Sequence, residues 1–140
     1  MPWALACLCL LLGACRAEAP EQRLRTQLTR LQNAVESHDA ANVLKIVADD
    51  FIGNDGMDRI RLRQMITAQM RLNQSIGATM GPPRITMAGE DMAVVEFTVM
   101  LTGGSGRFLP DQAQAYTVRS GWRIENGDWK VYRARWEAKF

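Results

Sequence analysis

Two side chains that can move protons stand next to each other in the stretch Ser37–His38–Asp39. His38 is the chain's one histidine, and an imidazole beside a carboxylate is a common general-base arrangement. Adjacent residues at a helix start seldom point together, however, and aspartate is a preferred N-cap. We therefore expect Asp39 to cap a helix and His38 to lie at the surface. One histidine without an available cysteine offers no metal-ligand spacing, so we expect no metal and no cofactor.

Two arginines, Arg133 and Arg135, alternate with other side chains in the last run of the chain. In a regular strand they share the face of Trp129, and a buried guanidinium requires a carboxylate, from a ligand or from an internal acid such as Glu96. A β-bulge near Arg133 would instead turn both arginines into water. We favour the bulge, and we keep Arg133 as a candidate pocket residue.

The first fifteen residues, MPWALACLCLLLGAC, carry no charged side chain. Their apolar run is too short to span a bilayer as a helix and predicts the hydrophobic region of an export signal. Leu12–Cys15 resembles the lipobox of bacterial lipoproteins. That resemblance implies a signal peptide over 1–14, cleavage before Cys15, and a diacylglycerol group on the Cys15 thiol. The alternative is an ordinary signal in which Cys15 is incidental.

Cysteine usage agrees with the lipoprotein interpretation. Cys7 and Cys9 lie in the segment to be removed, which leaves only Cys15 and therefore no internal disulfide in the mature chain. Residues 15–20 would form a lipid-anchored tether. The residue after the cysteine is Arg16 rather than aspartate, which in that family favours the periplasmic side of the outer membrane over the inner membrane.

The composition is that of one folded domain. The chain has 140 residues, 47% hydrophobic residues and a net charge of +2, and a domain of this length buries roughly two thirds of its unfolded surface. No basic run appears along the chain, whereas nucleic-acid binders usually show a concentrated basic face. We expect no nucleic-acid partner.

The periodicity of apolar residues changes once along the chain. Steps of three and four residues predict helices in the first half, and β-prone alternating runs predict strands from Arg84 onward. The expected elements are a helix with Leu24, Leu28, Leu31 and Val35 on one face, a helix from Asp39 through Ala48, a short strand at Phe51–Ile52, a turn at Asn54–Gly56, a helix from Asp58 with Leu62, Met65, Ile66 and Met70 inward, strands over 84–87, 92–101, 112–125 and 128–138, and a loop over 102–111.

The last two strands are predicted to form a hairpin at Asn126–Gly127, because Asn-Gly provides two residues that tolerate positive φ. This turn places Trp122 opposite Val131 and aligns Tyr116, Trp122 and Trp129 on one apolar face. The alternation would put Trp136 on the opposite face. Either a bulge turns Trp136 inward, or Trp136 marks a surface used by a partner.

These residues support a resemblance to the nuclear transport factor 2-like superfamily, and to its polyketide-cyclase-like bacterial branch in particular. The stretch VESHDAANVLKIVADDFI resembles its second-helix signature, and GWRIENGDWKVYRARW resembles its closing hairpin. The resemblance implies an α+β cone: N-terminal helices packed in a strongly curved antiparallel sheet over residues 21–140. It also implies a cavity at the wide end and, in many relatives, dimerisation through the outer sheet face.

Enzymes of the superfamily resembling ketosteroid isomerases suggest one catalytic candidate. Their general base follows the second helix, at a position that matches Asp55 here. Their two oxyanion donors match Leu31, which cannot donate a hydrogen bond, and a position near Ser120, which donates only weakly. We therefore expect Asp55 to be a turn residue, and Asp49 and Asp50 to end the second helix and hold the following strand.

The sequence thus predicts an envelope-anchored lipoprotein with a ligand- or partner-binding cone and no complete catalytic set. The alternative is an isomerase or cyclase acting on a small hydrophobic substrate, with Asp55 as its base. The expected partners are the membrane through Cys15, a small hydrophobic ligand, and a second copy bound through the outer sheet face. The candidate pocket-lining residues are Phe51, Tyr116, Trp122, Trp129 and Arg133.

Overall fold

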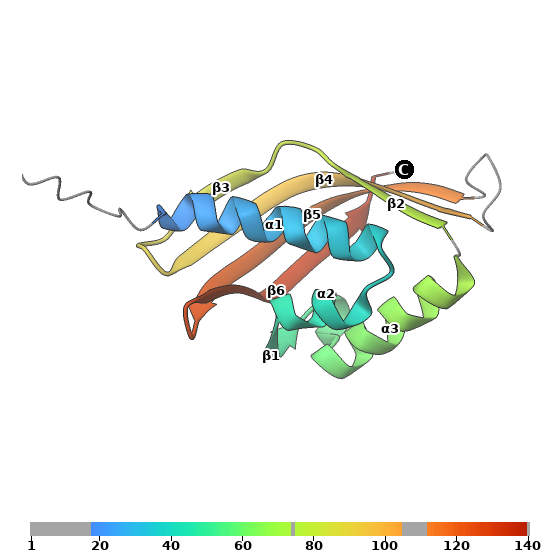
Figure 1. The fold of residues 1–140 in the computed structure, drawn as a ribbon, viewed down its shortest axis with the longest axis horizontal. Coiled ribbons are helices and arrows are strands. Elements are labelled where there is room, and N and C mark those ends of the chain that lie inside the picture. Colours follow the sequence, from blue (N-terminus) through green and yellow to red (C-terminus); the bar gives the residue numbers. More distant parts are fainter. Residues whose placement is uncertain (1–17, 74, 105–111, 140) are drawn as a thin grey trace, which may run out of the picture.

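Three helices lie against one face of a six-stranded curved sheet (Figure 1). The computed structural model describes residues 18–73, 75–104 and 112–139, so the predicted signal peptide, Cys15 and most of the glycine-rich loop lie outside the described residues. The α+β cone predicted from the sequence is confirmed.

The helices begin where their capping residues predict. Helix α1 spans Pro20–Glu36 with Pro20 at its first position, α2 spans Ala40–Ile46, and α3 spans Arg59–Leu72. The Asp39 side chain accepts a hydrogen bond from the Asn42 amide at 3.1 Å, and Asp58 accepts one from the Arg61 amide at 2.8 Å. Both carboxylates satisfy donors that a helix start leaves without partners.

Helix α2 is shorter than predicted. It ends at Ile46, because Val47–Ile52 forms strand β1, which pairs with the last strand of the chain. Val47 and Ala48 are buried in the strand. Apolar residues are equally expected at the inward side of a helix end, so their apolar character did not distinguish a helix end from a strand start.

The sheet has the strand order β1-β6-β5-β4-β2, and β3 also pairs with β4. The strands after β1 are β2 (Ser75–Met80), β3 (Arg84–Met87), β4 (Met92–Gly104), β5 (Gln112–Glu125) and β6 (Asp128–Ala138). All pairings are antiparallel except that of β1 with β6, which is parallel. The sheet is therefore mixed rather than purely antiparallel.

Strand β2 was not predicted, and β4 extends beyond its predicted end at residue 101. The two departures have one cause, because β2 pairs with the second half of β4 from Ser75↔Gly104 to Met80↔Val99. The short segment SIGATM contains a glycine and an alanine, both depleted in strands, so its own strand propensity is weak. Pairing with a strand that is already part of the sheet compensates for it.

The closing hairpin has the predicted register. Asn126 and Gly127 have φ values of 49° and 84°, and Trp122 lies opposite Val131. The register then shifts, because Gly121 lies opposite Arg133 and leaves Tyr132 as the extra residue of a bulge. This bulge returns Ala134 and Trp136 to the inner face, where both pack against the core. The bulge interpretation is confirmed.

Glycine is required opposite the bulge. A Cβ atom on Gly121 would lie 2.9 Å from the ring of Tyr132 and 3.0 Å from Cγ of Arg133. Both side chains therefore cross the outer face of the sheet over Gly121, and Arg133 is exposed to solvent.

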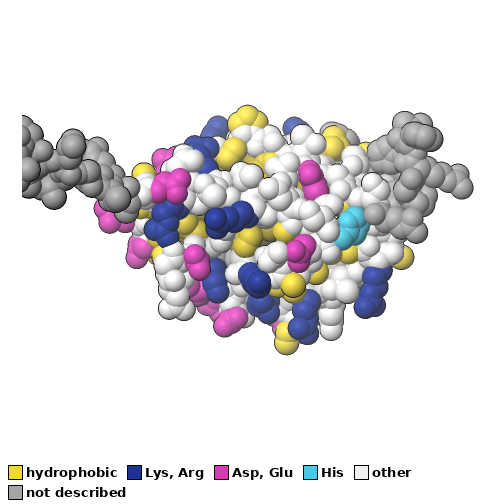
Figure 2. Space-filling model, viewed as in Figure 1, with side chains coloured by type: hydrophobic (Ala, Val, Ile, Leu, Met, Phe, Trp, Pro, Cys, Tyr) yellow, Lys and Arg dark blue, Asp and Glu magenta, His cyan; other side chains and the backbone are white. Residues whose placement is uncertain are grey.

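Seen from the helix side, Lys and Arg side chains are interspersed with Asp and Glu over much of the surface (Figure 2). Within the described ranges, no helix is long and apolar enough to cross a membrane.

Candidate functional site

The inner face of the sheet is closed at the hairpin end and becomes more exposed toward the far end. Four cross-strand rows on β4, β5 and β6 follow one another from the hairpin end: Ala93–Trp122–Val131, Val95–Ser120–Ala134, Phe97–Val118–Trp136 and Val99–Tyr116–Ala138. The first row is buried, the second is buried except for Ala134, the third is half-buried throughout, and the fourth is half-buried except for exposed Ala138. We call the third and fourth rows the open end.

Indole rings close the hairpin end. Trp122 is 1% exposed and Trp129 is 2% exposed, and both belong to the main core cluster. The Trp129 indole donates to the Pro20 carbonyl at 3.0 Å, and Gln27 donates to the Trp129 carbonyl at 2.9 Å. These bonds hold α1 against β6.

Ser120 has no proton left to offer a ligand. Its hydroxyl donates to the Val95 carbonyl at 2.9 Å and accepts from the Trp122 indole at 2.9 Å. A buried hydroxyl has one proton to donate. The weak oxyanion donor considered from the sequence is therefore already used in the core.

Trp136, at the open end, is held by a segment that lies 82 positions away in the chain. The Asn54 side chain donates to the Trp136 carbonyl at 2.7 Å and accepts from the Trp136 amide at 3.2 Å. A Cβ atom on Gly53 would lie 2.9 Å from the Trp136 ring. The sequence did not predict that Asn54 holds the Trp136 backbone or that Gly53 leaves room for its ring, because turn residues do not indicate which distant strand they contact.

Asp55 is an exposed turn residue. It sits in the short 3-10 turn η1 (Asn54–Gly56) with a left-handed φ of 54°. Leu31 packs against the core and has no polar side-chain atom, and the Ser120 proton is engaged. The structure does not bring these three residues together as an acid–base and oxyanion set.

His38 and Asp39 do not form a catalytic pair. His38 has a φ of 56°, and its Nε2 lies 2.8 Å from the Asn73 carbonyl, which links the α1–α2 turn to the end of α3. Asp39 caps α2 as predicted. Among the described residues, no group of three or more His, Cys, Asp or Glu side chains could hold a metal ion.

Of the five candidate pocket-lining residues, Phe51, Trp122 and Trp129 are buried in the core and Tyr116 is half-buried at the open end. Arg133 differs, because the bulge places it on the exposed outer face rather than inside the cone. Alternation alone could not determine its direction.

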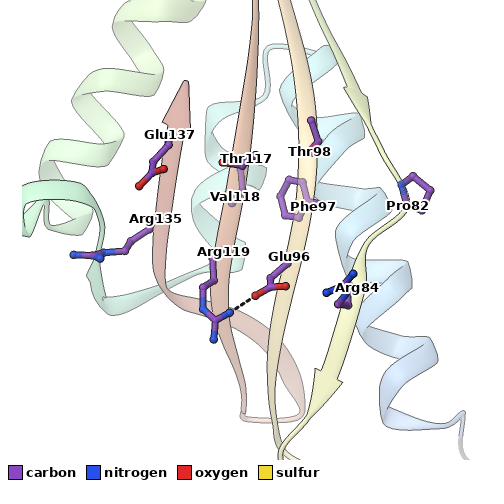
Figure 3. Close-up of a pocket in the computed structure, with 10 residues that line it drawn as sticks. All are labelled: Pro82, Arg84, Glu96, Phe97, Thr98, Thr117, Val118, Arg119, Arg135 and Glu137. Atoms are coloured by element: carbon purple, nitrogen blue, oxygen red, sulfur yellow. Dashed lines mark hydrogen bonds and ion pairs between the residues drawn. The ribbon is translucent and has the colours of Figure 1, made fainter. Parts of the chain in front are cut away.

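The outer face of the sheet carries an open hollow of about 560 Å³ (Figure 3). One cross-strand row runs through it: Arg84, Glu96, Arg119 and Arg135 on β3, β4, β5 and β6. Glu96 forms an ion pair with Arg119. Arg119 also lies directly opposite Arg135, and like charges in that position destabilise a sheet.

A second charged cluster on the outer face, centred on Arg123, has its charges paired within the chain. Arg123 forms ion pairs with Asp50 and, at 3.0 Å, with Glu125, and its guanidinium lies 5.0 Å from the centre of the Tyr132 ring. The hydrogen bond from Arg123 lowers the pKa of Asp50, and the same bond raises the pKa of Arg123. Asp50 thus holds strand β1, as predicted, by tying it to β5, but it does not end α2.

Neither a known protein-family profile nor any curated protein sequence matches the chain. Solved structures do. A candidate scytalone dehydratase from Novosphingobium aromaticivorans superposes with a TM-score of 0.77 at 12% identity, over 86% of this chain and 84% of that one. A nuclear transport factor 2-like protein of unknown function from Pseudomonas putida gives 0.72 at 20% identity, over 86% and 87%.

The chain has the nuclear transport factor 2-like fold. A nuclear transport factor 2-like superfamily protein from Salmonella enterica serovar Typhimurium agrees, with a TM-score of 0.71, 16% identity and coverage of 85% and 90%. The chain also matches a Bdellovibrio bacteriovorus protein with a TM-score of 0.73 at 13% identity, but it spans only 41% of that protein's length. At these identities the likeness concerns the nuclear transport factor 2-like fold, and fold alone does not determine function.

Proposed function

We propose that this chain is a lipid-anchored envelope protein whose nuclear transport factor 2-like cone binds a small hydrophobic molecule at the open end, without catalysing a reaction. The proposal rests on the decrease in burial along the inner face. Phe97 and Trp136 pack against the core cluster, and together with Val118 they stay half-buried, whereas the rows nearer the hairpin are buried except for Ala134. Part of the exposed surface of Phe97 and Val118 belongs to the outer hollow, which both residues line.

The chemistry of the open end suits an apolar guest. Leu31 and Ile66 from α1 and α3 also pack half-buried against the same core cluster. Ligand sites in proteins are mostly apolar concave surfaces with a few placed polar groups. Here Tyr116 provides a hydroxyl, and no described acid–base pair accompanies it.

Filling the open end tests the proposal. In Val118→Trp an indole would occupy the site, whereas Thr117→Trp would place the same indole on the outer face of the same strand. We expect the neutral fluorescent probe N-phenyl-1-naphthylamine to bind the wild type and Thr117→Trp alike, and to bind Val118→Trp at least about tenfold more weakly. Fluorescence titration measures this.

Circular dichroism would show that both variants are folded. Equal probe binding by the two variants would contradict an inner site. Absence of binding to the wild type, together with no small molecule in native mass spectra of protein taken from the envelope, would also contradict it. The anchor is a separate part of the proposal, and its test does not depend on the ligand.

A second copy of the chain is a further proposed partner, bound through the outer sheet face. The observation that favours it is the direct opposition of Arg119 and Arg135, with Glu137 beside them in the same hollow. In an interface about a two-fold axis, both copies contribute the same surface patch. A second copy would therefore bring its own carboxylates to these arginines.

Charge reversal tests this interface. Arg135→Glu would replace the cross-strand repulsion within one copy by attraction, but would set a carboxylate against the partner's carboxylates. We expect the wild type to sediment as a dimer and Arg135→Glu to raise the dissociation constant by at least about tenfold. Arg30→Glu, exposed on α1, is the control and should not change it. A monomeric wild type at high concentration would contradict the interface.

A further inference from the structure

Helix α3 presents an outward surface that combines apolar and cationic side chains. Only Leu62 of this helix is buried, and the opposite side is open to solvent. Ile60 and Leu72 are 59% and 75% exposed. With 100° between successive residues, the outward arc of the helix contains Ile60, Arg61, Gln64, Met65, Ala68, Arg71 and Leu72. Arg63 lies outside this arc, on the flank of the helix beyond half-buried Thr67. All eight residues are exposed. We call this arc the α3 surface.

The α3 surface has no carboxylate. Helix α3 contains four arginines and no Asp or Glu. Arg59 is directed inward, since its guanidinium donates to the Leu44 carbonyl at 2.9 Å. Arg61, Arg63 and Arg71 form no ion pair with any described residue. Their charge is therefore available to an external partner.

Helix α1 provides the contrast within the same fold. It has Glu21 in ion-pair contact with Arg25 at 3.1 Å, and none of its described large hydrophobic residues is exposed. Apolar exposure is thus not a general property of the helix layer. In Figure 2, hydrophobic and Lys or Arg side chains gather at the lower right, over α3.

We propose that the α3 surface docks on an anionic phospholipid bilayer. A helix with exposed apolar residues and arginines, but no acids, matches the interface of such a bilayer. There the apolar side chains enter the boundary between headgroups and acyl chains, and the guanidinium groups lie among the phosphates.

The proposed anchor at Cys15 would hold the domain close to the bilayer, and to that extent the inference rests on the proposed function. Four residues separate Cys15 from Pro20, where α1 begins. Extended, they reach at most about 18 Å. A domain of this size has a diameter on the order of 35 Å. The tethered domain therefore cannot stay clear of the bilayer, and one side of it faces the lipid.

The test uses the full chain carrying Cys15→Ser, so that no lipid contributes, with phosphatidylcholine vesicles that contain or lack phosphatidylglycerol. Residues 1–17 are common to all variants, so any attachment by the apolar leader is common too. Arg61→Gln, Arg63→Gln and Arg71→Gln together should weaken binding to the anionic vesicles about fivefold per arginine, on the order of 100-fold in all. Binding to neutral vesicles should not change.

A matched triple substitution provides the control. Arg84→Gln, Arg133→Gln and Arg135→Gln remove the same charge from the outer sheet face, and should weaken anionic binding less than about threefold if the helix makes the contact. Ile60→Ser with Leu72→Ser should weaken it at least about tenfold, whereas Met92→Ser with Met100→Ser, also on the outer sheet face, should not.

Equal losses from the two arginine triples would overturn the proposal, because net charge alone would then explain binding. Unchanged binding of the α3 triple would overturn it as well. If Ile60→Ser with Leu72→Ser converted a dimer to a monomer without affecting vesicle binding, the α3 surface would be a protein interface instead. Since every sample lacks the Cys15 lipid, failure of the anchor would leave these outcomes unaffected.

Discussion

Replacing Trp122 by alanine is expected to lower the free energy of unfolding by about 3–5 kcal/mol, the usual cost of removing a fully buried tryptophan. The ring is 1% exposed, and its indole N–H is bound to Ser120 within the core. Removal leaves a cavity that the rigid sheet cannot close, and it leaves the Ser120 hydroxyl without its donor. Urea denaturation measures the difference.

Two variants make this result specific. Trp122→Phe keeps most of the apolar volume and should cost about half as much. Trp136→Ala removes the same ring from the half-buried open end and should also cost about half. If Trp136→Ala proved as costly as Trp122→Ala, the distinction between a closed hairpin end and an open far end would be wrong.

The Cys15→Ser variant is expected to change where the protein is found rather than how stable it is. Without the thiol there is no attachment point for lipid, so radiolabelled palmitate should not enter the protein. Each buried methylene contributes about 0.8 kcal/mol, so two or three acyl chains hold a domain through a salt wash. We expect the wild type to require detergent for extraction, and Cys15→Ser to be released by high salt.

The folded domain is the internal control, because an unchanged unfolding transition would show that only the attachment was lost. Cys9→Ser, which changes another cysteine of the same leader, should keep the lipid label. Detergent-dependent extraction of Cys15→Ser, together with no palmitate label on the wild type, would contradict the anchor.

Local chemistry determined much of the fold. Asn126–Gly127 established the hairpin and its register, because two adjacent positions of positive φ need residues of this kind. Asp39 and Asp58 located two helix starts through their caps. The alternation of β5 assigned Trp122 to the inner face. Each of these features depends on residues a few positions apart, and sequence patterns report such interactions directly.

Long-range pairing determined the rest. The parallel contact of β1 with β6 shortened α2, and the far half of β4 made a strand of Ser75–Met80. Whether the hairpin bulged at Tyr132 determined that Arg133 faces water and Trp136 faces the core. The strand sequence is compatible with both outcomes. Whether a regular strand buries the two arginines or a bulge turns them to solvent depends on how the strand packs in the complete structure.

The site followed the same division. From the sequence, Leu31 and the lack of an acid near Ser120 already argued against a complete isomerase set. Only tertiary structure showed that the Ser120 proton is donated to Val95, that Asn54 holds Trp136, and that α3 leaves Ile60 and Leu72 in water. These hydrogen bonds and exposures depend on contacts between residues far apart in the chain. Which residues contact one another is decided only when the whole chain is packed.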